Sequence, residues 1–344
     1  MNQRLVWVDI SRGMSFIFVI YAHLRYCNIN LLFWFTPFVL ATFFFISGYL
    51  YKSSLSFTQV MEQRVRTLLL PFLLFGFSII LLSQFISFGD KIPLSDAILD
   101  FLIQIRGRND ELWFVAALFV MNIPFYFLVK YCRDFKTLLI VSLLLYLLST
   151  IYIYYLKLPF LPWHVQFFGF GCFYMALGYL YRQYENKLTF LETKSVFLIL
   201  LICYVAFLFI RKLFTPNYVD FNGSFYIFDS LIIIILGLAL CVFLSKRMQN
   251  TGLKFPLLSF VGANSLCYFA FHGKACALLQ FVVEKLFVRF SIAHTELIDL
   301  FFGIFITLAV TLILIIPSFI INRYFPFILG KNYKIPLLSN NTKK

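Results

Sequence analysis

Long apolar stretches constrain this chain more than any other feature of its sequence. About ten of them approach the ~20 residues that an α-helix needs to cross a bilayer, and short polar connections separate them. Hydrophobic residues make up 62% of the chain and charged residues only 13%, whereas soluble domains average about 25% charged residues. The sequence therefore predicts an all-α, polytopic membrane helix bundle of about ten transmembrane helices with no soluble domain. The predicted segments are 5–27, 31–51, 67–88, 111–130, 137–156, 165–182, 195–212, 224–244, 257–283 and 297–322.

The charged residues indicate how this bundle is organised and oriented. We assign residues 1–335 to one integral-membrane domain and residues 336–344 to a short cytoplasmic tail. When the N-terminus is placed in the cytoplasm, nearly twice as many Lys and Arg residues fall inside as outside, as the positive-inside rule requires. Both termini are therefore expected in the cytoplasm. The net charge of +14 is typical of this topology signal, and we expect no nucleic-acid partner.

Two further features limit what the chain can contain. The longest polar connection, 89–110, is only a loop with an expected surface helix around Ser95–Gln104. The seven cysteines lie in or beside apolar runs and form no C-x-x-C pair and no cluster with histidine. Such cysteines are typical of small core residues. We therefore expect no disulfide framework, no metal site and no permanently bound cofactor.

The first apolar segment carries three ionisable residues, which a plain membrane anchor would not. Asp9 lies three positions before Arg12, and His23 follows Arg12 by 11, so all three share one helical face at about 3.6 residues per turn. A charge near the bilayer centre costs roughly 2.5–3.5 kcal/mol on insertion scales and marks a functional site by default. The alternative is a structural ion pair at the membrane surface with a packed histidine. The shared face favours function.

A second basic pair precedes the third apolar segment. Arg64 and Arg66 fall on the cytoplasmic side by the charge distribution, in the connection that leads into LLLPF. They are equally well explained as a topology signal or as a phosphate-binding pair, since guanidinium geometry suits phosphate.

Other polar residues are expected toward the outer side. Glu111 and Trp113 open the fourth segment, and Ser265, His272 and Lys274 lie within the ninth. Trp113 is also explained as an interfacial aromatic residue, but polar groups inside a membrane need partners in the bundle. These five residues are candidates for an acceptor site.

Five motifs, taken in order, resemble one membrane-protein family. They are WVDISRG followed by its histidine, FFFISGYLY, QRVRTLLLPF, LWFVAALF and NSLCYFAFH. Their order and coverage of nearly the whole chain are similar to acyltransferase family 3, whose members O-acetylate sugars of bacterial surface polysaccharides. The compact, fucose O-acetylase-like members, which lack an appended extracellular domain, are most similar in style. In the second segment WFTPFVLATFF departs from the family's usual His or Met before the proline, which concerns the acceptor more than the chemistry.

The resemblance implies an O-acetyltransferase in the bacterial cytoplasmic (inner) membrane. Its co-substrate would be acetyl-CoA or another acyl-CoA from the cytoplasm, and its other partners a glycan or lipid-linked oligosaccharide outside and the membrane lipids. The residues of this chain allow a mechanism for that reaction. His23 would be the general base on a sugar hydroxyl, Arg12 would hold the donor, and Asp9 would hold Arg12. Arg64 and Arg66 would add phosphate contacts.

Two other classes of protein compete with this interpretation. A polysaccharide or small-molecule transporter or flippase also uses intramembrane ionisable residues, but the segment pattern contains no inverted repeat, which many transporters have. A glycan polymerase or ligase would favour large outer loops, which the sequence lacks.

Overall fold

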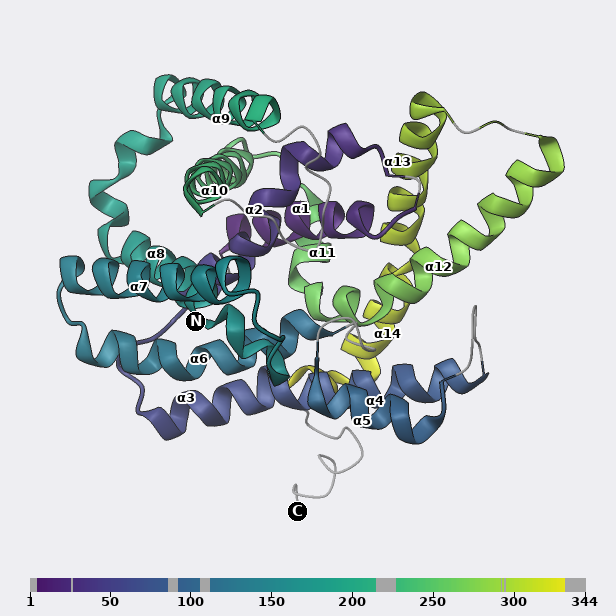
Figure 1. Ribbon diagram of the computed structural model, residues 1–344, viewed down its shortest axis with the longest axis horizontal. Helices are drawn as coiled ribbons and strands as arrows, with labels where there is room; N and C mark the ends of the chain where they lie inside the picture. Colours follow the sequence, from purple (N-terminus) through teal and green to yellow (C-terminus); the bar gives the residue numbers. More distant parts are fainter. Residues whose placement is uncertain are drawn as a thin grey trace, which may run out of the picture.

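The computed structural model describes residues 5–25, 27–85, 92–105, 112–214, 227–291, 293 and 295–331. Helices and turns, without any strand, make up these described ranges (Figure 1). The α-helices are α1 Val6–Ala22, α2 Ile29–Tyr49, α3 Phe57–Arg64, α4 Leu70–Phe85, α5 Leu94–Ile103, α6 Trp113–Tyr131, α7 Phe135–Thr150, α8 Phe168–Tyr184, α9 Lys194–Phe214, α10 Ile227–Asn250, α11 Pro256–Ala263, α12 Ser265–Phe290, α13 Glu296–Ile313 and α14 Ile315–Tyr324. Short π or 3₁₀ turns are η1 Val65–Leu69, η2 Ile151–Tyr155, η3 Pro162–Phe167, η4 Glu185–Lys187, η5 Thr189–Glu192 and η6 Pro326–Leu329.

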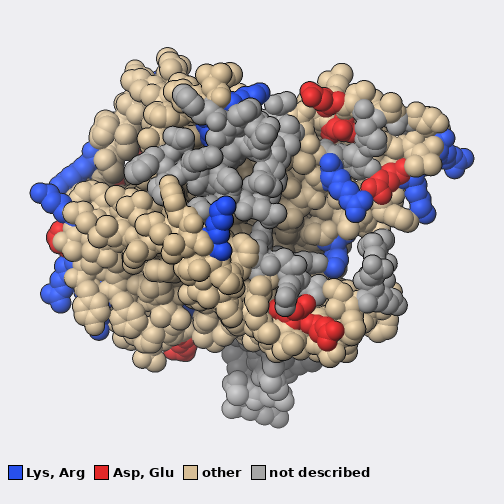
Figure 2. All heavy atoms as spheres, viewed as in Figure 1, with Lys and Arg blue, Asp and Glu red and all other residues tan. Residues whose placement is uncertain are grey.

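The predicted all-α membrane bundle is confirmed. Within the described residues, 8 helical stretches are long and apolar enough to cross a membrane. The other two predicted segments form α1 and α8, each 17 residues long, which is about the shortest length that spans a hydrocarbon core. The surface helix expected around Ser95–Gln104 is α5. Most of the face in Figure 2 is uncharged. Lys and Arg side chains appear at its left edge, where Figure 1 places the turn between α6 and α7, and also toward its right edge.

The third helical stretch begins earlier than predicted. The Ser56 side chain accepts a hydrogen bond from the backbone N–H of Gln59, and the Gln59 side chain accepts one from the backbone N–H of Ser56. This capping box starts α3 at Phe57. Such reciprocal bonds satisfy amides that a helix start leaves open. The helix then continues through η1 into α4. Arg64 and Arg66 therefore lie on a helix, not in the polar connection that we expected.

The ninth predicted segment is two helices, not one. The backbone at Asn264 leaves the helical region (φ −113°, ψ 17°) and separates α11 from α12. The tenth segment is also divided, at Leu314, where α13 ends and α14 begins. Pro317 follows in the first turn of α14, where its missing N–H removes a hydrogen bond that a continuous helix would need.

Helix α1 lies near the centre of the bundle, among α2, α10 and α11 (Figure 1). Its first turn is held by α10, because the Trp7 amide donates to Gln249 (2.8 Å) and the Lys246 ammonium lies 5.7 Å from the Trp7 ring centroid. Lys246 also pairs with Glu185 and with Glu192 (2.6 Å) in the α8–α9 connection. These contacts fix the end of α1 that carries Asp9 and Arg12.

Candidate functional site

Two glycines bring the backbones of α1 and α11 into direct contact. A Cβ added at Gly13 would lie 2.1 Å from the carbonyl oxygen of Leu258, and one added at Gly262 would lie 1.8 Å from that of Asp9. Small residues permit this close approach between membrane helices. The pairing shows that α11 runs opposite to α1, so its C-terminal end reaches the turn of α1 that carries Asp9 and Arg12.

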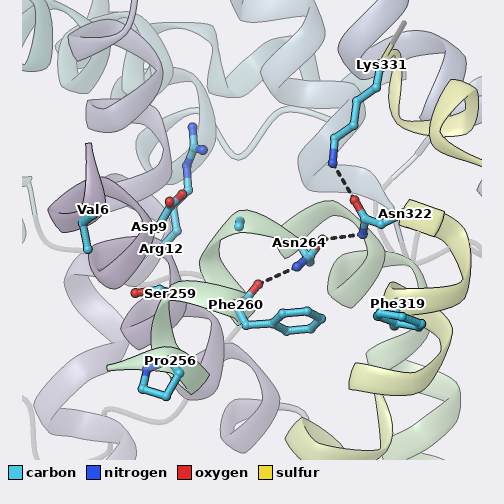
Figure 3. A pocket seen from close by; sticks show the side chains of 11 residues that line it. Val6, Asp9, Arg12, Pro256, Ser259, Phe260, Asn264, Phe319, Asn322 and Lys331 are labelled. Atoms are coloured by element: carbon cyan, nitrogen blue, oxygen red, sulfur yellow. Dashed lines mark hydrogen bonds between the residues drawn. The ribbon is translucent and has the colours of Figure 1, made fainter. Parts of the chain in front are cut away.

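A pocket of about 690 Å³ lies at this crossing. Pockets of this size are typical of small-molecule and cofactor sites. Its walls come from α1, from α11 with the break at Asn264, from α14 and from the segment after η6 (Figure 3). The lining residues are Val6, Asp9, Arg12, Pro256, Ser259, Phe260, Ala263, Asn264, Phe319, Asn322 and Lys331.

A second arginine lies behind the first. Arg64 and Arg12 are close enough for their positive charges to interact, and Asp9 interacts in turn with Arg12. The Arg64 Nε is buried and has no hydrogen-bond partner among the described residues. Burial, with a smaller contribution from Tyr126 and against the opposing effect of Arg64, raises the pKa of neighbouring Tyr51 to about 12. Tyr51 is therefore neutral at physiological pH, so it supplies no counter-charge to Arg64.

The predicted phosphate-binding pair is thus divided by the structure. Arg64 is half-buried next to Arg12, whereas Arg66 is exposed on η1. Asp9 interacts with Arg12, and Arg64 adds a second guanidinium group beside Arg12. A positive excess at a partly dry site favours an anion.

Two imidazoles lie together at the opposite end of α1. The ring centroids of His23 and His272 are 4.7 Å apart. The His23 Nδ1 lies 2.8 Å from the Val19 carbonyl oxygen, and the His272 Nδ1 lies 3.0 Å from that of Phe269. A carbonyl only accepts, so each neutral ring carries its proton on Nδ1 and its lone pair on Nε2. The His23 side chain is exposed and that of His272 is buried.

The turn after α1 is tied to α12, which holds the two histidines in register. The Arg25 amide donates to the Gln280 side chain, and the Arg25 guanidinium pairs with Glu284 at 2.9 Å. Since α12 runs along α1 from Tyr268 onward, the break at Asn264 lets one predicted segment contribute to both ends of α1.

An aromatic cluster fills the space between the two ends. Phe16 lies between Arg12 and His23 on the same face of α1 and is fully buried. Its ring centroid is 4.6 Å from that of Phe269 and 5.5 Å from that of His272. Arg12 and His23 are about 16 Å apart along the helix at roughly 1.5 Å per residue. The buried Phe16 separates the two ends of this face.

The candidate acceptor residues fall at different places. His272 is beside His23, and Lys274 is half-buried two residues further along α12. Ser265 begins α12 and follows Asn264 of the pocket, so it lies toward the arginine end. Trp113 packs on Phe114 and on the buried His164, at ring-centroid distances of 5.9 and 5.3 Å. Glu111 lies outside the described residues.

Sequence reasoning missed three residues of this arrangement: Phe16, Asn322 and Lys331. Phe16 is one of many apolar residues in its segment, and Lys331 is one of the many Lys and Arg residues that indicate the topology. Asn322 could have been identified from the sequence, because a side-chain amide near the end of an apolar membrane helix needs a hydrogen-bond partner. Within the described ranges, no group of three His, Cys, Asp or Glu side chains is placed to hold a metal ion.

Comparison with known proteins places the chain in a family. Searches of curated proteins and of solved structures found no match to it. A family model described as an acyltransferase domain matches residues 5–316. This span includes α1, α11 and α12 and therefore the arginines, the pair of histidines and the break at Asn264. The chain belongs to acyltransferase family 3.

Proposed function

We propose that this membrane acyltransferase moves an acyl group, most simply acetyl, from acyl-CoA to a hydroxyl of a surface or lipid-linked glycan. The proposal rests on the difference between the two ends of α1. One end has a cationic pocket, and the other has a pair of imidazoles. The pocket suits the phosphates of acyl-CoA. The exposed His23 suits a hydroxyl that arrives from the other side.

The reaction follows from the tautomer of His23. Its Nε2 accepts the proton of the glycan hydroxyl while the hydroxyl oxygen attacks the thioester carbonyl carbon. The new C–O bond forms, the C–S bond breaks, and the thiolate of CoA takes the proton from the imidazolium. Arg12, held by Asp9, binds the donor at a distance from the reacting carbonyl and does not touch it. The acyl arm reaches His23 only when Phe16 moves aside.

Mass spectrometry of surface glycans from cells with and without the gene tests this function. A difference of one acyl mass per acceptor sugar is the expected result, and the value identifies the acyl group. Unchanged glycan masses combined with loss of the glycan from the surface would favour the transporter or flippase instead.

We also propose that the protein lies in the bacterial inner membrane with both termini in the cytoplasm, which puts the arginine end of α1 inside. The support is the excess of Lys and Arg on that side of the predicted topology. Reporter fusions in the connection 89–110 and after Arg133 are expected on opposite sides of the membrane. The same side for both would contradict the topology.

The two basic residues of the third helical stretch are expected to differ in effect. Arg64→Ala should weaken acyl-CoA binding about tenfold or more, because a charge-assisted hydrogen bond at a partly desolvated site contributes about 1.5–3 kcal/mol. Arg66→Ala, at an exposed position, should change affinity only about two- to threefold, since exposed ion pairs contribute about 0–1 kcal/mol. Isothermal titration of the two purified variants makes the comparison. Equal affinities for both variants and the unchanged protein would leave these arginines as topology signals only.

A further inference from the structure

The last described segment of the chain closes one side of the pocket. We define the C-terminal strap as residues 326–331, which comprise η6, Gly330 and Lys331. Gly330 has φ +67°, and a Cβ added there would lie 2.3 Å from the Arg66 carbonyl oxygen. Only a glycine adopts this conformation at this distance without strain. The strap is therefore packed against η1, next to the two arginines of the third helical stretch.

A chain of hydrogen bonds directs the strap's lysine toward the pocket. The Lys331 ammonium donates to Oδ1 of Asn322, and Nδ2 of Asn322 donates to Oδ1 of Asn264, each at 2.5 Å (Figure 3). The Asn264 amide in turn donates to the Phe260 carbonyl at 2.8 Å. Both asparagines are thereby held in one orientation. An ammonium has three N–H donors, so Lys331 retains donors for a ligand.

The charges around the pocket do not balance. Its lining contains two cations, Arg12 and Lys331, and a single acid, Asp9. Arg64 adds a further positive charge behind Arg12. In Figure 3, Arg12 and Lys331 lie on opposite sides of the pocket, with the two asparagines beside Lys331. An anion between the two cations would be held from both sides, which one exposed lysine alone could not do.

We propose that Lys331 binds a phosphate group of the donor and makes the pocket selective for phosphate-bearing acyl thioesters, an inference that rests on the proposed function. The pocket thereby distinguishes acyl-CoA from a thioester that has the same acyl-pantetheine arm without phosphate. Phe319, Asn322 and Lys331 lie beyond residue 316, where the family match ends. The strap is thus a contribution of this chain outside the matched span.

The test uses the full-length protein in discs of zwitterionic lipid and measures binding and KM for two donors, acetyl-CoA and S-acetylpantetheine. Lys331→Gln should weaken the binding of acetyl-CoA about tenfold, which is the usual effect of losing one charge-assisted hydrogen bond. It should leave the affinity for S-acetylpantetheine and the value of kcat unchanged. Lys331→Arg should restore most of the affinity. Lys136→Gln is the matched control, because Lys136 is an exposed lysine of α7 that does not line the pocket.

Other outcomes overturn the inference. An equal loss of affinity for both donors would mean that Lys331 affects binding only by stabilising the fold. No loss of affinity for either donor would mean that Lys331 binds no phosphate. Added anionic lipid supplies the other source of phosphate: if Lys331→Gln changes only the response to that lipid, the residue binds a headgroup. Failure of the unchanged protein and all variants to bind acetyl-CoA would refute the proposed function itself, and with it this inference. Binding by the unchanged protein separates the two failures.

Discussion

Replacement of His23 by alanine should reduce acyl transfer by about 10²–10⁴-fold, the usual contribution of a general base. The protein should still insert and still bind acyl-CoA, because the cationic pocket lies about three helical turns away on α1. His23 suits this role for two reasons. Its Nδ1–H donates to the Val19 carbonyl, which leaves the lone pair on Nε2, and its side chain is exposed to an arriving hydroxyl. Acetyl transfer to the glycan at equal protein level is the measurement.

His272 provides the comparison, because it is the other imidazole of the pair. It is only 4% exposed, and its Nε2 has no hydrogen-bond partner among the described residues. A glycan hydroxyl cannot reach it without rearrangement of α1 and α12. His272→Ala should therefore reduce transfer less than His23→Ala, through loss of the ring that packs on Phe16 and His23.

Two results would contradict this assignment. Near-normal transfer by His23→Ala together with loss in His272→Ala would make His272 the base. Normal transfer by both variants would exclude an imidazole mechanism. Acyl-CoA binding by each variant is the control, since a loss of binding would indicate a changed fold instead of lost chemistry.

The apolar runs were sufficient to predict the helical bundle, because burial in lipid leaves few alternatives to helices. They were not sufficient to predict its interruptions. Asn264 is one amide in a long apolar run, and periodicity alone does not show that α11 and α12 run in opposite directions along α1. The early start of α3 was readable, since Ser56 and Gln59 have the spacing of a capping box. We did not predict this start because the polar residues Glu62, Arg64 and Arg66 indicated a loop between two apolar segments.

The site was predictable only within single segments. The spacing of Asp9, Arg12 and His23 predicted one shared helical face. In the structure Asp9 and Arg12 lie on α1 and His23 is its C-cap residue, with Phe16 between. Which helices are neighbours depends on long-range packing. His272 therefore could be expected in the outer half of its segment but not against His23, and Lys331 could not be connected with Arg12 at all.

Gly262→Ala should lower thermal stability and acyl-CoA affinity together. The added Cβ would lie 1.8 Å from the Asp9 carbonyl oxygen and 2.6 Å from its carbonyl carbon. These are backbone atoms, so no side-chain rotation relieves the contact and α1 and α11 must separate. Overpacking of this kind costs about 1–3 kcal/mol, occasionally more, although alanine otherwise favours a helix over glycine by about 1 kcal/mol. Asp9 and Arg12 move with α1, so the pocket changes shape.

A second glycine provides the matched control for this prediction. A Cβ added at Gly171 of α8 would lie 2.0 Å from Sδ and 2.9 Å from Cγ of Met121, which are atoms of a flexible side chain that can change rotamer. Gly171→Ala should therefore cost less stability, and it should leave donor affinity unchanged because neither residue lines the pocket. Unfolding midpoints of the purified variants and titration with acyl-CoA measure both effects. Equal behaviour of the two variants would mean that the close contact of α1 with α11 does not set the geometry of the pocket, because a backbone clash and a yielding side chain would then have had the same consequence.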